Sequence, residues 1–355
     1  MTATNALQFP ISEAPAMGQP LAVAEGVYWL RMPLPFALNH INLWLLEDSN
    51  GWTIIDTGIN TDACKELWQQ VFDNHLNNKP VHQLIVTHLH PDHIGLAGWI
   101  CELWNLELKM SRTDYMACRL LITDTGKPAP KAAIDFYQRA GVSDEQLNSY
   151  KTKFGGYGKS IYAMPESFVR LQDGEFVTMA GHRWEIIVGR GHAPEHLCLL
   201  CPELNVFIAG DQLLPSISSN VSVWPTEPHS NPLKDWLDSC AMLQQRTPAD
   251  VLVLPSHGQV FFGAHQRLQR LIDGHEKSLI KLLEACQQPQ RNVDLFSQLF
   301  RRPISDDVLT LAVGETQAHL NYLVSKKSSK AAPVIMVLFG IKLFRRRLFY
   351  AHYYY

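Results

Sequence analysis

Short apolar runs separated by turn residues fill the first quarter of the chain. β-Branched and aromatic residues favour strands, and the Pro, Asn and Gly residues between the runs favour turns. On this pattern we expect strands at 26–32, 39–47 and 52–55, a helix at 63–76, a strand at 84–87 and a helix at 94–104. Strands and helices in this mixture predict a layered α/β architecture.

A second half, from about 175 to 260, repeats the same pattern with apolar runs at 184–188, 206–209 and 251–254. Between the halves lies an insertion, about 111–168, which is mostly helical by its spacing of apolar residues. A further helix is expected to begin at Asn231-Pro232, because Asn is a common N-cap and Pro suits the first helical position.

The pattern changes after Gly263, where apolar residues recur at helical spacing and predict a small domain of three helices up to residue 325. The tail, 326–355, has an apolar run at 334–339 that is too short to span a bilayer, which needs about 20 residues. This tail is interpreted as an interfacial membrane segment, as a divergent end or as the product of an altered reading frame. Residues 1–20 lack the basic start and apolar core of a secretory signal.

The composition predicts a soluble enzyme in a reducing, cytoplasmic compartment. The chain has 355 residues, 46% of them hydrophobic, and seven scattered cysteines that predict buried thiols, including the pair Cys198 and Cys201. Residues 1–325 carry 24 basic and 34 acidic groups, a formal charge of −10. Binding to a phosphate backbone usually needs a clustered basic surface, so nucleic acid is not the expected partner. A local basic groove that binds nucleic acid is the alternative.

The segment from Thr87 to His93, with the sequence THLHPDH, carries the strongest chemical signal. In a strand, side chains two positions apart point the same way, so His88 and His90 are expected to project together from a strand end. Pro91 then turns the chain and lets Asp92 and His93 face the same cavity. Imidazole and carboxylate ligands suit Zn²⁺ and related first-row ions, so the segment predicts a metal site.

Three further places offer metal-type ligands, each directly after an apolar, strand-like run. They are the segments GHAPEH, which contains His192, GD, which contains Asp211, and SHG, which contains His257. Ligands at strand ends, supported by glycine and proline turns, are how a rigid sheet holds several groups around one cavity.

The order HLHPDH, GHAPEH, GDQ and SHG, preceded by the segment IDTG that contains Asp56, resembles the metallo-β-lactamase superfamily of hydrolases over about residues 20–262. The resemblance implies a four-layer αββα sandwich as the catalytic domain, 1–262, with the helical insertion at 111–168. One difference from the family pattern is Glu195, which stands where the third motif more often has glycine.

Residue by residue, the resemblance implies that one metal is held by His88, His90 and His192 and the other by Asp92, His93 and His257, with Asp211 bridging them. Asp92 and Asp211 are then the catalytic carboxylates. Asp56 and His196 are expected to contact the ligands without binding a metal themselves. Two divalent ions are expected, Zn²⁺ first, with Fe or Mn compatible with the same donors.

The C-terminal helices, 263–325, resemble the winged-helix-like domain attached to one branch of these hydrolases. The matching places include Ala285-Cys286-Gln287 and the stretch from Gly314 to Leu320. We expect this domain to serve packing or homodimer formation, since the charge distribution offers no phosphate-binding surface. A wing hairpin should follow the third helix, and the tail at 326–355 departs from that pattern.

The expected chemistry is hydrolysis by a metal-activated hydroxide, because two metal ions lower the pKa of a shared water. A thioester or lactone has a good leaving group, and these compounds and other acyl esters are the expected small-molecule substrates. A phosphodiester needs an extra proton donor for its leaving oxygen, which leaves a single-strand endoribonuclease or phosphodiesterase as the alternative. A non-catalytic regulator or scaffold and a diiron redox protein are further alternatives. Candidates for the substrate pocket are Tyr157, Lys159 and His229, with Tyr115 and Phe136 as possible apolar walls.

Overall fold

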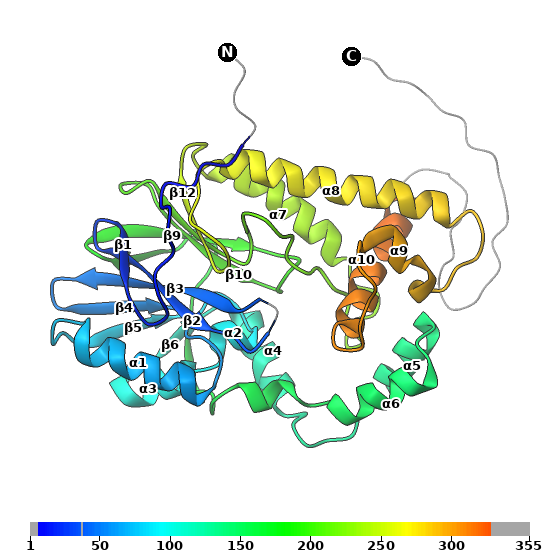
Figure 1. Cartoon of the computed structure of the whole chain (residues 1–355), viewed down its shortest axis with the longest axis horizontal. Helices are drawn as coiled ribbons and strands as arrows, with labels where there is room; N and C mark the ends of the chain where they lie inside the picture. Colours follow the sequence, from blue (N-terminus) through cyan, green and yellow to red (C-terminus); the bar gives the residue numbers. More distant parts are fainter. Residues whose placement is uncertain (1–5, 37, 328–355) are drawn as a thin grey trace, which may run out of the picture. The chain divides into compact units, whose positions relative to one another are not determined.

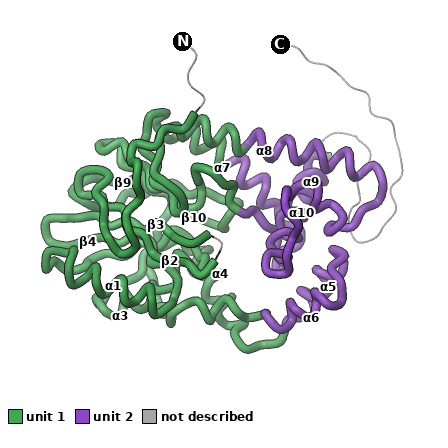
Figure 2. The backbone as a smooth tube through the Cα atoms, viewed as in Figure 1, with its two compact units in different colours: residues 1–128, 154–219, 239–271 green, residues 129–153, 220–238, 272–355 purple. Residues whose placement is uncertain are grey.

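The computed structural model describes residues 6–36 and 38–327, which form two compact units (Figure 2). Unit 1 comprises the chain up to residue 128 together with 154–219 and 239–271. Unit 2 comprises 129–153, 220–238 and the chain from residue 272 onward. The domain boundaries that we predicted at 262 and 325 stay predictions.

The first sheet of unit 1 has seven strands in the order β1-β2-β3-β4-β5-β6-β7. Strands β1 to β4 pair antiparallel, and β4 to β7 pair parallel. Their bounds are β1 Leu21–Ala24, β2 Val27–Pro33, β3 His40–Asp48, β4 Gly51–Ile55, β5 Val81–Ile85, β6 Leu108–Met110 and β7 Phe168–Arg170.

The second sheet has five strands in the order β12-β11-β10-β9-β8, with β11 and β12 parallel and the other pairs antiparallel. Their bounds are β8 Phe176–Met179, β9 His182–Gly189, β10 His196–Cys201, β11 Val206–Gly210 and β12 Leu252–Pro255. The apolar runs predicted as strands in both halves of the chain are therefore strands, with ends shifted by a few residues.

The alternation of side chains along β2 and β3 explains how the first sheet buries both faces. Trp29 and Trp44 are cross-strand partners whose rings stack 6.3 Å apart, and both belong to the core between the two sheets. Leu30 and Leu43, one residue along each strand, belong to the core on the opposite face. Burying one such side chain contributes roughly 1.5–3 kcal/mol, so this double-sided packing fixes the register of the strands.

Helices cover the outer face of each sheet in unit 1 (Figure 1). On the first sheet, Trp68 of α1 and Ile100 of α3 pack in one core cluster with Leu43. On the second sheet, Arg246 at the end of α7 forms an ion pair of 2.5 Å with Glu185 of β9. Unit 1 is thus an αββα sandwich, as expected. The helix bounds are α1 Asp62–Asn74, α2 Pro91–Ile94, α3 Ala97–Trp104, α4 Arg112–Ile122, the 3₁₀ helix η1 Tyr157–Ser160, α7 Pro232–Arg246 and α8 Ala264–Ala285.

Unit 2 contains helices from the insertion and from the end of the chain. They are α5 Lys131–Ala140, α6 Asp144–Lys153, η2 Asn292–Leu295, α9 Phe296–Leu299 and α10 Leu309–Lys327, together with parts of α7 and α8. The helical character of both regions agrees with the sequence analysis. A winged helix is not confirmed: from residue 264 to 327 every regular element is helical, and the expected wing falls beyond 327, outside the described residues.

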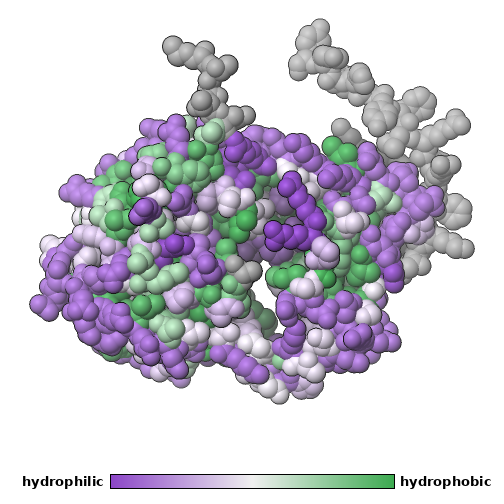
Figure 3. Space-filling model, in the orientation of Figure 1, coloured by the Kyte–Doolittle hydropathy of each residue, from purple (hydrophilic) through white to green (hydrophobic). Residues whose placement is uncertain are grey.

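All seven cysteines are buried and free, as their scattered positions predicted. Hydrophilic side chains dominate the face of the molecule seen in Figure 3, with hydrophobic residues in scattered patches between them. None of the helices within 6–36 and 38–327 combines the length and apolar character that a bilayer crossing requires.

Candidate metal centre

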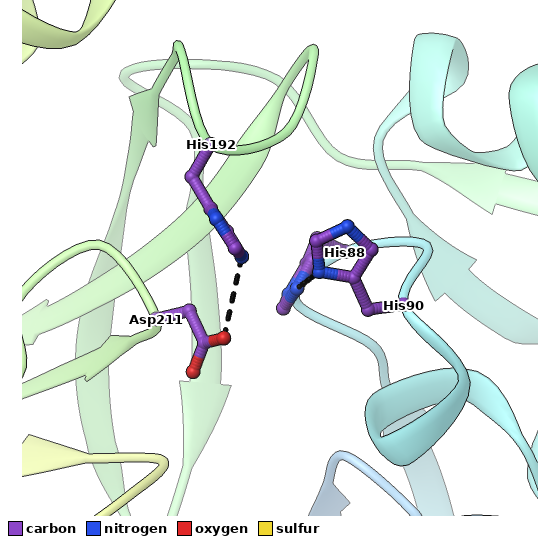
Figure 4. A group of neighbouring side chains, drawn as sticks. All are labelled: His88, His90, His192 and Asp211. Atoms are coloured by element: carbon purple, nitrogen blue, oxygen red, sulfur yellow. Dashed lines mark hydrogen bonds and ion pairs between the residues drawn. The ribbon is translucent and has the colours of Figure 1, made fainter. Parts of the chain in front are cut away.

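Four side chains from three loops of unit 1 converge at one edge of the two sheets. His88 and His90 follow β5, His192 lies between β9 and β10, and Asp211 follows β11. Figure 4 shows the two histidines from the first sheet facing His192 and Asp211 from the second sheet. One ligand atom from each of the four lies within 4.8 Å of the others. We call these four residues the first group.

A second group of ligand-type side chains lies next to the first and consists of Asp92, His93 and His257, again within 4.8 Å of one another. Asp211 connects the two groups. Its Oδ2 lies 3.2 Å from Nε2 of His192. Its Oδ1 lies 3.6 Å from Nε2 of His93 and 3.5 Å from Nε2 of His257. The seven residues singled out from the sequence are therefore brought together around Asp211, which faces both groups.

His88 and His90 do not extend a strand, which corrects the expectation from sequence. Strand β5 ends at Ile85, and His90 is the N-cap of the short helix α2. The ladder ends because the N–H of Thr87 donates to Oδ1 of Asp56, at 2.7 Å, and not to a neighbouring strand. The two imidazoles nevertheless meet, with Nε2 of His88 lying 2.9 Å from Nδ1 of His90.

The electrostatics of the two groups differ. Burial, reinforced by neighbouring imidazoles, holds the pKa of His88 well below its usual value and lowers the pKa of His90 to about 3, so both rings are neutral. Burial alone would also lower the pKa of His93, but the carboxylates of Asp56, Asp92 and Asp211 outweigh it and raise that pKa well above its usual value. The described residues thus place excess negative charge around His93, where a cation is favoured.

Asp211 is held as a carboxylate. Burial raises its pKa, but His257 and His93, together with a hydrogen bond from His192, outweigh burial and keep that pKa well below the usual range. The same balance, with His93 and His257 opposing burial, lowers the pKa of Asp92. Ionised carboxylate is the state in which an aspartate binds a metal ion.

Asp56, expected to support the site from behind, does so through three contacts. Its carboxylate accepts the N–H of Thr87 and, at 2.8 Å, the hydroxyl of the same residue. Nδ1 of His93 lies 2.7 Å from its Oδ2, so this carboxylate fixes the proton on Nδ1 and leaves Nε2 directed at the second group. Asp56 has a positive φ of 62°, a strained conformation that these contacts hold in place.

His196 supports the bridging aspartate. Its Nε2 accepts the N–H of Asp211 at 3.0 Å, and burial keeps its pKa well below the usual value, so the ring is neutral and can accept. Gly210 makes this contact possible because a Cβ at that position would overlap the His196 ring. The positive φ of 54° at Gly210 also favours glycine.

Three supporting residues were missed by the sequence analysis. Nδ1 of His257 lies 2.8 Å from the backbone carbonyl of His40 and donates to it. The buried Asn42 donates to the carbonyls of Pro255 and Gly258, at 2.8 and 2.9 Å, and so fixes the loop that carries His257. Asp114, also fully buried, accepts the N–H of Leu89 between the two histidines of the first loop. These partners lie far apart in sequence and follow no motif.

Buried atoms without hydrogen bonds indicate that the residues fit metal ions. Nε2 of His93 and Oδ1 of Asp211 are buried, and neither makes a hydrogen bond. Nitrogen and oxygen donors around a carboxylate shared by both groups are the donor set that divalent first-row ions prefer. The residues therefore fit a divalent metal ion.

The proposed pocket residues lie in different surroundings. The hydroxyl of Tyr157 donates to the carbonyl of Leu89 at 2.5 Å, beside the first group. Lys159, on η1, is exposed, and His229 is exposed in unit 2. Tyr115 is buried and donates to the carbonyl of Pro165. Phe136 is buried in unit 2.

A third set of ligand-type residues, His182, Cys201 and Glu203, also has its atoms within 4.8 Å of one another. It lies at the start of β9 and the end of β10, whereas the first group lies at the opposite ends of these two strands. It is therefore separate from the candidate centre.

Comparison with known families agrees with this geometry. The model of the metallo-beta-lactamase superfamily matches residues 38–257, and that of the metallo-beta-lactamase-like C-terminal domain matches residues 279–332. The chain belongs to the metallo-beta-lactamase superfamily and is a hydrolase of that superfamily.

Among solved structures, a beta-lactamase domain protein from Burkholderia ambifaria superimposes with a TM-score of 0.82 and 39% identity, over 89% of this chain and 92% of that one. Among curated proteins, the chain is similar to the probable metallo-hydrolase YqjP of Bacillus subtilis (strain 168), with 24% identity over 86% of this chain and 94% of that protein.

Two relatives with more specific names are more distant. A linear primary-alkylsulfatase of Pseudomonas sp. (strain ATCC 19151) is 25% identical over 62% of this chain and 42% of that protein. The acyl-coenzyme A thioesterase MBLAC2 of Homo sapiens is 21% identical over 72% of this chain and 85% of that protein.

Proposed function

We propose that this protein is a binuclear metal-dependent hydrolase that acts on thioesters or other acyl esters and lactones. His88, His90 and His192 would hold one ion, Asp92, His93 and His257 would hold the other, and Asp211 would contribute to both. The observation that carries the proposal is the position of Asp211, whose Oδ2 faces His192 while its Oδ1 faces both His93 and His257. Zinc is the first expectation, and iron or manganese suits the same donors.

The ions, when bound, supply Lewis acidity that makes hydroxide available near neutral pH and polarises the substrate oxygen. The chain's own residues do the rest. Asp56 and the His40 carbonyl each fix the proton of one imidazole on Nδ1, so the Nε2 atoms of His93 and His257 need no reorganisation. Asp92, whose Oδ2 lies 3.4 Å from Nε2 of His257, is the proposed proton acceptor for the attacking water.

The −10 formal charge of residues 1–325 disfavours the approach of a polynucleotide and so supports an acyl substrate over RNA. A thioester or lactone also needs no strong general acid, because its leaving group departs readily. The similarity to an acyl-coenzyme A thioesterase points in the same direction. A single-strand endoribonuclease is the competing function, and a packing or dimer-forming role is proposed for the C-terminal helices.

The proposal is tested with metal-loaded protein against thioesters, lactones, a phosphodiester, a primary alkyl sulfate and single-stranded RNA at matched low salt. The expected result is hydrolysis of a thioester or lactone that His90→Ala abolishes. Metal-dependent cleavage of RNA or of the sulfate ester, with thioesters and lactones untouched, would replace the acyl assignment. Metal binding without hydrolysis of any of these substrates would overturn the proposed substrate class.

A further inference from the structure

A buried carboxylate joins the two loops that supply the histidines of the first group. Asp114 lies in the first turn of α4 and is completely buried. Its Oδ1 accepts the N–H of Leu89 at 3.1 Å, and its Oδ2 accepts the N–H of Glu195 at 2.7 Å. Ser111 donates its hydroxyl to the same Oδ2 at 3.3 Å. One side chain therefore binds the backbone of two separate loops.

The side chain of Glu195 in turn binds the backbone of α4, the helix that carries Asp114. Its Oε2 accepts the N–H of Thr113, at 3.0 Å, in the first turn of α4. The first N–H groups of a helix have no partner inside the helix, so this bond satisfies one of them and places negative charge where the helix dipole favours it. Burial raises the pKa of Glu195, but the bonds from Thr113, with Arg170 and Arg190 nearby, lower it overall. Glu195 is therefore ionised when it accepts.

The two backbone N–H groups that donate to Asp114 lie close in sequence to metal-type ligands. Leu89 stands between His88 and His90, and its carbonyl accepts the hydroxyl of Tyr157, so both of its polar backbone groups are held. Glu195 follows His192 by three residues and precedes His196. The loop with Leu89 follows β5 of the first sheet, and the loop with Glu195 joins β9 and β10 of the second. The hydrogen bonds of Asp114 therefore connect the two sheets on the side of the first group.

The second group is held by other residues. Asp56 orients His93, the His40 carbonyl orients His257, and Asn42 fixes the backbone on both sides of His257. Within the described residues, the side-chain hydrogen bonds of Asp114 go only to Leu89, Glu195 and Ser111. Removing the Asp114 side chain should therefore disturb the first group selectively.

We infer that Asp114 and Glu195 are a positioning pair that sets the separation of the His88–His90 loop from the His192 loop, and so the metal affinity of the first group alone. Glu195, which departs from the more usual glycine, thereby acquires a role through its side chain. This inference rests on the proposed two-ion centre.

The test measures Zn²⁺ affinity by competition with a chromophoric chelator in two backgrounds. His257→Ala leaves the first group as the intact site, and His90→Ala leaves the second. Adding Asp114→Ala should weaken Zn²⁺ binding on the order of 10- to 100-fold in the His257→Ala background and leave it unchanged in the His90→Ala background. Asn42→Ala, the matched control, should give the opposite pattern. Burial raises the pKa of Asp114 to about 6, so the titrations are run well above that pH.

Conservative variants separate positioning from folding. Glu195→Gln keeps an oxygen that can accept from Thr113 and should retain Zn²⁺ affinity, whereas Glu195→Ala should lose it. Asp114→Asn keeps its size and one acceptor oxygen, so it replaces Asp114→Ala if that variant does not fold, and an intermediate loss confined to the first group is expected. Thermal unfolding of the metal-free variants, compared with Ser111→Ala, gives the structural cost separately.

The outcomes distinguish the inference from the proposed function. Wild-type protein that binds two Zn²⁺ ions, with Asp114 variants that weaken both groups equally or neither, overturns the positioning pair alone. Wild-type protein that binds no Zn²⁺, Fe²⁺ or Mn²⁺ overturns the proposed centre and the inference with it.

Discussion

Nδ1 of His93 lies 2.7 Å from Oδ2 of Asp56, and both side chains are buried beneath the candidate metal centre. The same carboxylate accepts the backbone N–H of Thr87, whose neighbour His88 belongs to the first group. One aspartate, left-handed at φ 62°, therefore supports residues next to both groups. This position explains why the IDTG segment belongs to the site although Asp56 is not among the grouped ligands.

Asp56→Asn tests this support. The variant keeps an oxygen for the N–H of Thr87, but its amide nitrogen cannot accept from His93. The His93 proton should then move to Nε2, where it opposes metal binding. We expect metal affinity to fall on the order of 10- to 100-fold, measured by chelator competition. An affinity equal to that of the wild-type protein would show that Asp56 does not set the proton position.

Asp211→Ala and His90→Ala should each abolish hydrolysis without unfolding the chain. Each removes a side chain whose charge or lone pair is directed at the site, so metal affinity and activity should fall together. Circular dichroism checks the fold, and initial rates on the accepted substrate check activity. Asp92→Ala should behave in the same way with some loss of stability, because Asp92 lies in α2. Retained activity in either of the first two variants would contradict their roles.

Gly210→Ala should damage the centre through His196. The added Cβ would overlap the His196 ring, and the positive φ of 54° adds a cost of about 1–2 kcal/mol for a residue with a Cβ. Loss of the bond between His196 and the N–H of Asp211 should lower both stability and metal affinity. Gly274→Ala is the control, because nothing lies within 4 Å of a Cβ there and it sits inside α8. Chemical denaturation should show the control to be neutral or stabilising.

Glu315 in unit 2 should make stability depend on pH. Burial raises its pKa to about 7 although Asn220 donates to it, so the folded state holds a proton that the unfolded chain releases at lower pH. Its contribution is fully favourable below the ordinary value of 4.5 and declines as pH rises to about 7. Above that pH the contribution of Glu315 no longer changes. The total loss in the free energy of unfolding is about 3 kcal/mol.

Glu315→Gln should remove this part of the pH dependence and make the variant relatively more stable at pH above 7. Denaturant unfolding across the pH range, beside the exposed control Glu284→Gln, measures the difference. Parallel pH profiles for the wild-type protein and Glu315→Gln would show that folding does not raise the pKa of Glu315.

Much of the fold could be predicted because local sequence patterns identify its strands. The apolar runs around Trp44, Ile186 and Ile208 are bounded by turn residues, and these runs are strands in the structure. The end of β5 was misjudged because Asp56, distant in sequence, takes the N–H of Thr87 that a longer strand would have used. Local patterns hold no information about that competition.

The seven ligand-type residues were found from the order of their motifs, and they meet in space. Asp114, Asn42 and the carbonyl of His40 could not be found in this way. Asn42 and Pro255, for example, are 213 residues apart, and a buried asparagine or aspartate carries no periodic signal. Their roles come from tertiary contacts between loops, which only the folded chain brings together.

The two-ion centre is best tested by counting the metal ions bound to each chain. Wild-type protein, His90→Ala and His257→Ala are loaded with Zn²⁺, freed of excess metal and measured by elemental analysis together with protein concentration. We expect two ions in the wild-type protein and one in each variant, since each substitution removes a ligand from a different group. A wild-type chain without bound metal, after loading with Zn²⁺, Fe²⁺ or Mn²⁺, would contradict this expectation.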